Sequence, residues 1–153
     1  MDNRQNINPV SSTEQTQVAR SLLDWLNQYR DFPLGIKKIE AEFLPASGSG
    51  ICLTAATAAY KTQEYINGWY TAQFQFALAY RTAPANSNQR LNAMDVLTEI
   101  AAWAENREDL PDLGAGKTSV SIERTAPAVM IARYEDGSED YQILMTFDYE
   151  VKA

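Results

Sequence analysis

Residues 65–81 read Tyr-Ile-Asn-Gly-Trp-Tyr-Thr-Ala-Gln-Phe-Gln-Phe-Ala-Leu-Ala-Tyr-Arg, and this stretch decides the fold. From Ile66 onward the even positions are apolar, aromatic or glycine, and the odd positions carry polar residues such as Gln73 and Gln75. Successive side chains of a strand point to opposite faces, so the pattern predicts a strand with one buried face. A strand of this length would span about 55 Å, whereas a domain of this size is about 40 Å across. The run therefore predicts a strand that bends, or one whose end leaves the subunit and is covered by another copy.

Two helices are predicted by their spacing and by their start signals. Residues Ser11-Ser-Thr-Glu14 form a candidate capping box, in which the Ser11 hydroxyl and the Glu14 carboxylate satisfy amides of the first turn. Apolar residues at helical spacing then continue to about Arg30. The second helix is expected from about Asn88 to Arg107.

Further strands are predicted on both sides of the central run. They are expected at residues 36–44, with Ile39, Ala41 and Phe43 on the buried face, and at 51–60, 118–124, 128–134 and 141–151. Asp136-Gly137 is a strong hairpin signal before the last strand, and Gly68 marks a bulge or bend in the central run.

This order of elements predicts an α+β fold. Strands joined by hairpins and segregated from helices favour a mainly antiparallel sheet with two helices packed on one face and a long projecting strand or hairpin. The length of 153 residues predicts a single domain over residues 1–153, with residues 1–10 as a flexible N-terminal arm. The start of the chain carries no apolar segment and no stretch reaches membrane-span length, so we expect no signal peptide, no membrane contact and synthesis in the cytoplasm.

Composition argues against several kinds of chemistry. The chain contains no histidine and one cysteine, Cys52, so a histidine base, a cysteine zinc site and an internal disulfide are ruled out. Cys52 lies in an apolar run and is expected to be a small buried hydrophobe. The formal net charge of −7 does not suit a protein that grips nucleic acid, although an acidic wall that repels DNA stays possible.

The remaining motifs for catalysis or binding are weak. Gly114-Ala-Gly-Lys-Thr118 resembles the end of a phosphate-binding loop, but a strand rather than a helix is expected after it. The acidic pairs Glu40/Glu42 and Asp148/Glu150 are typical of a solvent-facing sheet surface, and Asp136, Glu139 and Asp140 lack calcium-loop spacing. We therefore expect no catalytic residue, no cofactor site and no metal site, and the protein is not predicted to be an enzyme.

The aromatic residues divide into two groups. Trp25 and Trp103 fall on or beside helical apolar stripes and are expected in the core. Trp69 lies on the otherwise polar face of the central run, and exposed Trp and Tyr are typical anchors of protein interfaces. The alternative is that Trp69 faces a helix. The predicted oligomer interface consists of Tyr65, Ile66, Asn67, Trp69 and Tyr70.

Several short segments stand in a familiar order. They are Trp25-Leu-Asn27, Ala59-Tyr-Lys-Thr62, Gly68-Trp-Tyr-Thr-Ala-Gln-Phe-Gln-Phe76, Trp103-Ala-Glu105, Ala132-Arg-Tyr-Glu-Asp-Gly137 and Tyr141-Gln-Ile-Leu-Met145. In this order and spacing, over roughly residues 5–152, the chain resembles the tail terminator, or minor capsid, proteins of long-tailed phages and prophages of Gram-positive bacteria.

This resemblance implies a structural role in the virion tail or neck, after assembly in the host cytoplasm. Proteins of this family form hexameric rings that cap the tail tube, stop its polymerisation and face the head-side connector, while DNA passes through the ring without specific binding. The implied partners are other copies of the chain, the tail tube protein and the connector protein. Two alternatives stay open: a head-completion or stopper protein of the neck, and a small-ligand-binding α+β domain with a deep pocket.

Overall fold

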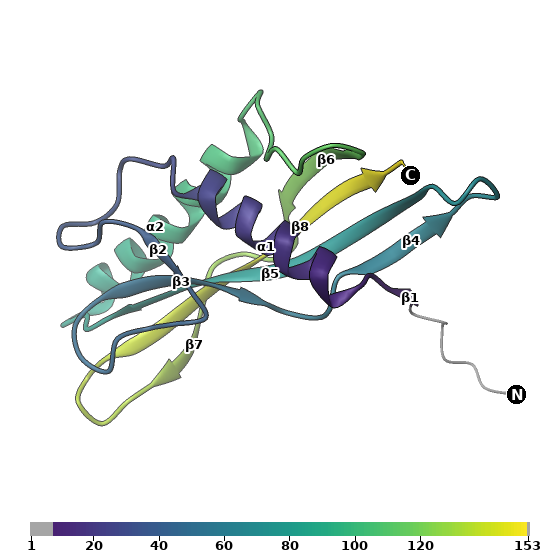
Figure 1. Ribbon diagram of the computed structural model, residues 1–153. Helices are drawn as coiled ribbons and strands as arrows, with labels where there is room; N and C mark the ends of the chain where they lie inside the picture. The colour runs from purple at the N-terminus through teal and green to yellow at the C-terminus, as the bar shows by residue number, and fades with distance from the viewer. Residues whose placement is uncertain (1–7, 153) are drawn as a thin grey trace, which may run out of the picture.

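Two long antiparallel strands run through the middle of the sheet (Figure 1). The computed structural model describes residues 8–152. Strand β5 (Tyr70–Thr82) and strand β8 (Glu139–Val151) have 13 residues each, and they pair over their whole length. Tyr70 lies opposite Val151 at one end of the pair, and Thr82 lies opposite Glu139 at the other.

Shorter strands line both outer edges of this central pair. They are β3 (Gly50–Ala55) and β4 (Tyr60–Glu64) beside β5, and β6 (Lys117–Arg124) and β7 (Val129–Arg133) beside β8. The sheet is completed by β1 (Asn8–Pro9), which is antiparallel to β4, and by β2 (Ile39–Ala41), which is parallel to β3. All the other strand pairs are antiparallel.

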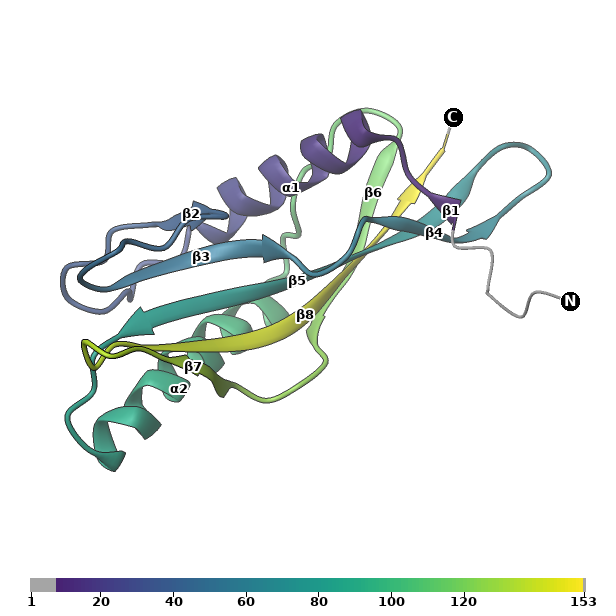
Figure 2. The same cartoon turned by 90° about the horizontal axis from the view of Figure 1, so that it is seen from below.

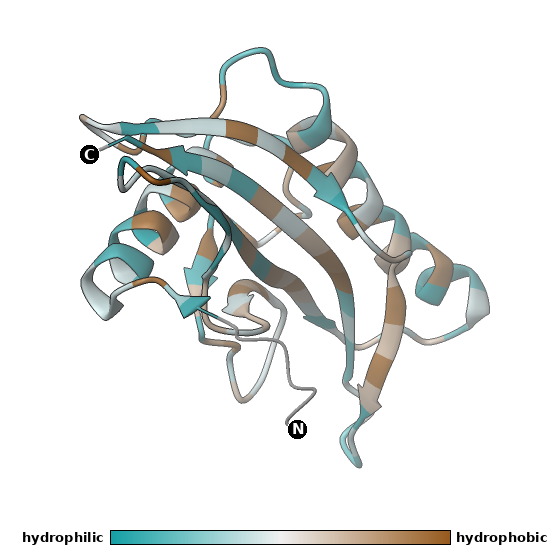
Figure 3. Cartoon of the chain, turned by 90° about the vertical axis from the view of Figure 1, so that its right-hand side faces the viewer, coloured by the Kyte–Doolittle hydropathy of each residue, from teal (hydrophilic) through white to brown (hydrophobic). Residues whose placement is uncertain are grey.

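Both helices cover the same face of the sheet. Helix α1 (Ser12–Leu26) begins at Ser11, whose hydroxyl accepts a hydrogen bond from the Glu14 amide, and α2 (Ser87–Glu105) begins at the cap Asn86. The rings of Trp25 and Trp103, one from near the end of each helix, lie 5.2 Å apart. Figure 3 shows the two helices along the two margins of the curved sheet.

The core lies between the helices and this sheet face. Even-numbered residues of β5 and odd-numbered residues of β8 point into it, because their register pairs Phe74 with Phe147 and Phe76 with Met145. All four side chains are at most 1% exposed. Alternating brown and teal bands along the long strands in Figure 3 show the same period of two.

The predicted α+β class is confirmed, since the protein has a mostly antiparallel sheet and two helices. The single long strand expected over residues 65–81 is wrong in one respect. Only Tyr70–Thr82 form β5, while residues 65–69 turn the chain back onto β4. Similarly, the strand expected at 51–60 is divided into β3 and β4 by residues 56–59.

The strand expected at residues 36–44 is also shorter than predicted. Glu42 has a φ of 54°, which interrupts the extended backbone. Ala41 and Phe43, which were expected on the buried face with Ile39, are both exposed, and Phe43 is 58% exposed. Of the predicted N-terminal arm, residues 1–7 lie outside the described part of the chain. Asn8–Pro9 pair with β4, and Val10 is buried.

Candidate assembly surface at the β4–β5 hairpin

The β4–β5 hairpin closes in a three-residue turn at Ile66-Asn67-Gly68. The Tyr65 amide donates to the Trp69 carbonyl at 2.8 Å, and the Gly68 amide donates to the Tyr65 carbonyl at 3.0 Å. Gly68 has a φ of +88°, in the left-handed region that glycine adopts without strain. The glycine that suggested a bend in the sequence therefore ends the turn, which lies beyond the ends of β1 and α1 in Figure 2.

The five residues of the predicted interface occupy two different environments. The side chains of Tyr65, Ile66 and Trp69 are exposed, and that of Ile66 is fully in solvent. Asn67 is exposed too, but its side-chain oxygen accepts a hydrogen bond from the Trp69 amide and so fixes the turn. Tyr70 is partly buried and points back toward α1. We define the hairpin tip as Tyr65, Ile66 and Trp69.

A carboxylate on α1 holds the base of the hairpin. Glu14 accepts hydrogen bonds from the hydroxyls of Tyr70 and Tyr149, on neighbouring strands β5 and β8. Burial and then the hydrogen bond to Glu14 raise the pKa of both phenols, so both stay protonated as donors. The predicted capping box is thus half formed, because the Glu14 carboxylate binds the two tyrosines. The hairpin base is tied to the core through this cluster.

Replacing Glu14 with alanine should lower the free energy of unfolding by about 2 kcal/mol, because it leaves the buried Tyr149 hydroxyl without its acceptor. Chemical denaturation measures the loss. Glu14→Gln keeps one acceptor oxygen, so its free energy of unfolding should fall clearly less than that of Glu14→Ala. Equal losses in the two variants would show that the tyrosine hydrogen bonds do not hold this region.

Two lysines flank the aromatic residues of the hairpin. Lys61 Nζ lies 4.5 Å from the centre of the Tyr70 ring, and Lys152 Nζ lies 5.2 Å from that of Trp69. Lys61 also pairs with Glu64 at 3.2 Å. Cations over aromatic faces are attracted by the ring quadrupole. The hairpin tip is therefore an apolar surface with the cation of Lys152 and the Lys61–Glu64 ion pair at its margin.

A second group of exposed large side chains lies on β7 and at the residue that follows it, and sequence reasoning missed it. We define the β7 patch as Val129, Met130, Ile131 and Tyr134, which are each between 39% and 49% exposed. Residues 128–132 are apolar without alternation, although a sheet with one solvent face normally alternates. That unbroken run was the signal available in the sequence.

Two buried carboxylates at the start of β8 are held by arginines. Asp140 accepts two hydrogen bonds from Arg81, at 2.7 and 2.8 Å, and one from Tyr134. Glu139 accepts from Tyr141, Arg133 and Arg90. Burial alone would raise the pKa of Asp140, but its arginine and tyrosine partners outweigh burial and lower it.

The pKa of Glu139 is lowered as well, first by Tyr141 and then by its arginines, against the effect of burial. Its own effect on Tyr141 has the opposite sign: burial, and then the hydrogen bond to Glu139, raise the pKa of that phenol to about 12. Both carboxylates at the start of β8 are therefore kept ionised by structural ion pairs, whereas a general acid at neutral pH needs a raised pKa.

Three of the other acidic residues singled out in the sequence accept hydrogen bonds within the fold. Glu42 accepts from the Ala55 amide, Asp148 accepts from Gln73, and Asp136 accepts from the Ser138 amide in its turn. After Gly114 and Gly116 the chain enters strand β6, so the phosphate-loop-like segment does not lead into a helix. Cys52 is buried, as predicted.

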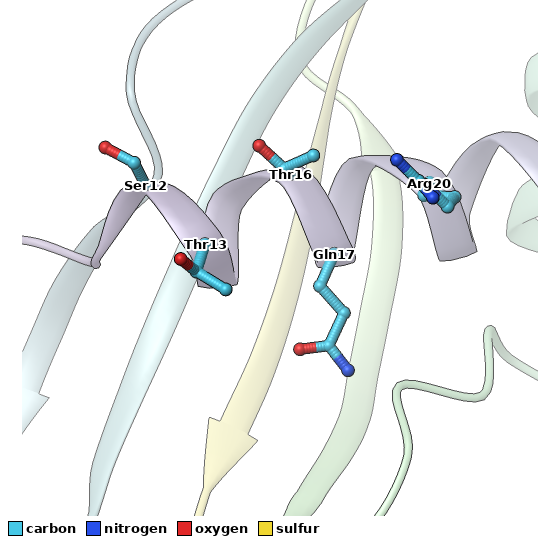
Figure 4. A pocket seen from close by; sticks show the side chains of 5 residues that line it. All are labelled: Ser12, Thr13, Thr16, Gln17 and Arg20. Atoms are coloured by element: carbon cyan, nitrogen blue, oxygen red, sulfur yellow. The ribbon is translucent and has the colours of Figure 1, made fainter.

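Helix α1 carries a hollow of about 480 Å³ on its surface (Figure 4). Its side chains are spread along the helix and do not converge on one point. The Gln17 side-chain amide donates to the Leu113 carbonyl at 3.3 Å. The residues that line the hollow are Ser12, Thr13, Thr16, Gln17 and Arg20. This arrangement gives no support to a nucleophile paired with a base.

Among residues 8–152, no group of three or more acidic, cysteine or histidine side chains is placed to hold a metal ion. None of the helices in that part of the chain combines the length and the apolar character that a membrane crossing requires.

Comparison with known proteins gives no assignment. No protein-family model matches the chain, and no curated protein matches it. The resemblance noted from the sequence segments therefore stays a prediction.

Proposed function

We propose that this protein is a structural component of a phage tail, which assembles as a ring at the head-proximal end of the tail tube, stops tube polymerisation and joins the tail to the head connector. The observation that carries the proposal is the hairpin tip, where three large apolar side chains are exposed on a hairpin whose base is fixed to the core through Glu14. Aromatic anchors on a preformed surface are the usual centre of a protein interface.

The surface charge fits the proposed passage of DNA through the ring. The net charge of −7 disfavours tight contact with phosphates. On the sheet face opposite the helices, Gln73 donates to Asp148 at 3.0 Å, and Tyr60 donates to Gln73 at 2.5 Å. A polar surface whose side chains bind one another offers DNA few groups to hold it.

Trp69→Ala should weaken self-association while leaving the fold intact. The ring is 38% exposed, so its loss should cost the monomer less than about 1 kcal/mol, whereas an interface anchor is worth about 2 kcal/mol or more in assembly. Sedimentation velocity at several concentrations measures the association. Phe43→Ala, which removes a more exposed aromatic side chain far from the hairpin, is the matched control and should associate like the natural chain. A large fall in melting temperature for Trp69→Ala would place this side chain in the core instead.

The proposed role in the tail is tested with tail tube protein from the same genome. Added protein should stop tube growth at substoichiometric amounts, because only tube ends bind it, and light scattering during polymerisation follows this. Unchanged growth together with binding to the connector protein would favour a stopper role in the neck.

A further inference from the structure

We infer that the hairpin tip of one copy of this chain binds the β7 patch of the next copy, so that neighbouring subunits join head to tail. The inference rests on the proposed ring and names the two surfaces that form each joint.

The β7 patch has the properties of a surface that a partner covers. Four large side chains on β7 and at the residue that follows it are each at least 39% exposed at an edge of the sheet, where β7 pairs only with β8 among the described strands. Proteins normally protect exposed edge strands with charges or prolines, since an open apolar edge promotes association. Within β7, only Arg133 carries a charge, and it is paired with Glu139.

A bulge at Ile131 determines what kind of partner fits. The register between β7 and β8 shifts between Met130 and Ala132, so Ile131 has no residue opposite it. A bulge twists the strand and breaks the regular spacing of its outer amides and carbonyls, which hinders the addition of another strand. The contact is therefore made by side chains, and a partner with a few large apolar side chains on a narrow turn fits it. The hairpin tip has this form.

The two surfaces lie at opposite ends of the subunit, as Figure 2 shows. The hairpin turn adjoins the Tyr70–Val151 end of the central strand pair, and β7 pairs with residues Glu139–Gln142 at the other end. Strands of 13 residues separate these ends by roughly 40 Å. One chain therefore cannot bring its own two surfaces together, and contact between unlike ends of neighbours closes into a ring when the rotation allows it.

Exposed charges of opposite sign lie at the margins of the two surfaces. Lys152 is exposed beside Trp69 at the hairpin tip. Glu135 and Asp136 are exposed in the β7–β8 turn that follows the β7 patch. This complementarity favours contact between tip and patch over contact between two tips or two patches.

Two single variants and their mixture test the joint. Ile66→Asp damages the tip and leaves the β7 patch intact, whereas Ile131→Asp does the reverse. Each should associate at least about 30-fold more weakly than the natural chain. An equimolar mixture should form one-to-one dimers and nothing larger, because only one intact tip meets one intact patch. Sedimentation velocity distinguishes these species by mass.

The other outcomes contradict the inference. A natural chain that stays monomeric over the whole concentration range would overturn it, as would an Ile131→Asp variant that associates normally or a mixture without dimers.

Leu91→Asp is the control variant: it changes an exposed leucine on α2 and should associate like the natural chain. Lys152→Glu combined with Glu135→Lys gives a check without apolar changes: each reversal should weaken association, and the double variant should regain it.

The joint and the role in the tail can fail separately. Head-to-tail dimers from a protein that does not stop tube growth would refute only the tail proposal. Growth arrest by a protein whose Ile131→Asp variant still arrests growth and still assembles would refute only this joint.

Discussion

Replacing Arg81 with methionine should lower the free energy of unfolding by roughly 3 kcal/mol, because it leaves Asp140 buried without its partner. The guanidinium makes two hydrogen bonds to the carboxylate and a third to the Pro45 carbonyl, and so connects β5, β8 and the segment before β3. Loss of one member of such a pair costs more than the pair contributes, since the other charge stays desolvated.

The pH dependence of this loss has a defined sign. In the natural chain the pKa of Asp140 is lowered, so its contribution to stability is present above about pH 4 and declines as the pH falls through the lowered value. Without Arg81, burial raises that pKa, and protonation relieves the buried charge. The difference in free energy of unfolding between the natural chain and the Arg81→Met variant should therefore become smaller as the pH falls below about 5.

Urea unfolding at pH 7 and pH 4 measures both effects. Lys38→Met is the control, because Lys38 and Glu40 form an exposed pair whose loss should change stability by less than about 0.5 kcal/mol. A gap that stays constant with pH would show that Asp140 is not the group left unpaired.

Phe147→Ala is the other substitution with a large expected effect, and it should lower the free energy of unfolding by about 3 to 5 kcal/mol. Phe147 is fully buried at the middle of β8, opposite Phe74, where the sheet faces both helices. The surrounding side chains come from a sheet and two helices that cannot all move inward, so a cavity should stay behind.

Thermal unfolding of Phe147→Ala and of Leu144→Ala separates the two faces of the sheet. Leu144 lies three residues away on the opposite, partly exposed face, so Leu144→Ala should lower the stability clearly less than Phe147→Ala does. Similar losses in the two variants would mean that the core does not lie between the sheet and the helices.

Much of the fold follows from local patterns in the sequence. The period of two in residues 70–81 and 141–151 predicts most of both central strands, because each has one face on the core and one face toward solvent. The helix starts at Ser11 and Asn86 follow from side chains that cap the first turn. Asp136-Gly137 indicated the β7–β8 hairpin correctly.

The errors arose where the pattern continues through a change of backbone direction. Alternation runs from Ile66 into β5 without a break, yet the chain reverses at Asn67-Gly68. Apolar residues can stay at every second position through a turn of three residues, so the alternation does not reveal the turn. The parallel pairing of β2 with β3 and the partners of Glu14 depend on contacts between distant segments, and no local pattern reports these.

The candidate interface was only partly accessible from sequence. An exposed Trp69 could be inferred from its place on a polar face, but the inward direction of Tyr70 required knowledge of α1. The β7 patch could be inferred only from the missing alternation in residues 128–132, which is also the pattern of a strand covered on both faces.

Electron microscopy of the purified protein mixed with tail tubes tests the central claim most directly. We predict a ring of this protein at one end of each tube, with the β4–β5 hairpin of every subunit against β7 of its neighbour. Tubes that carry no added density at either end, or density from single unconnected subunits, would contradict it.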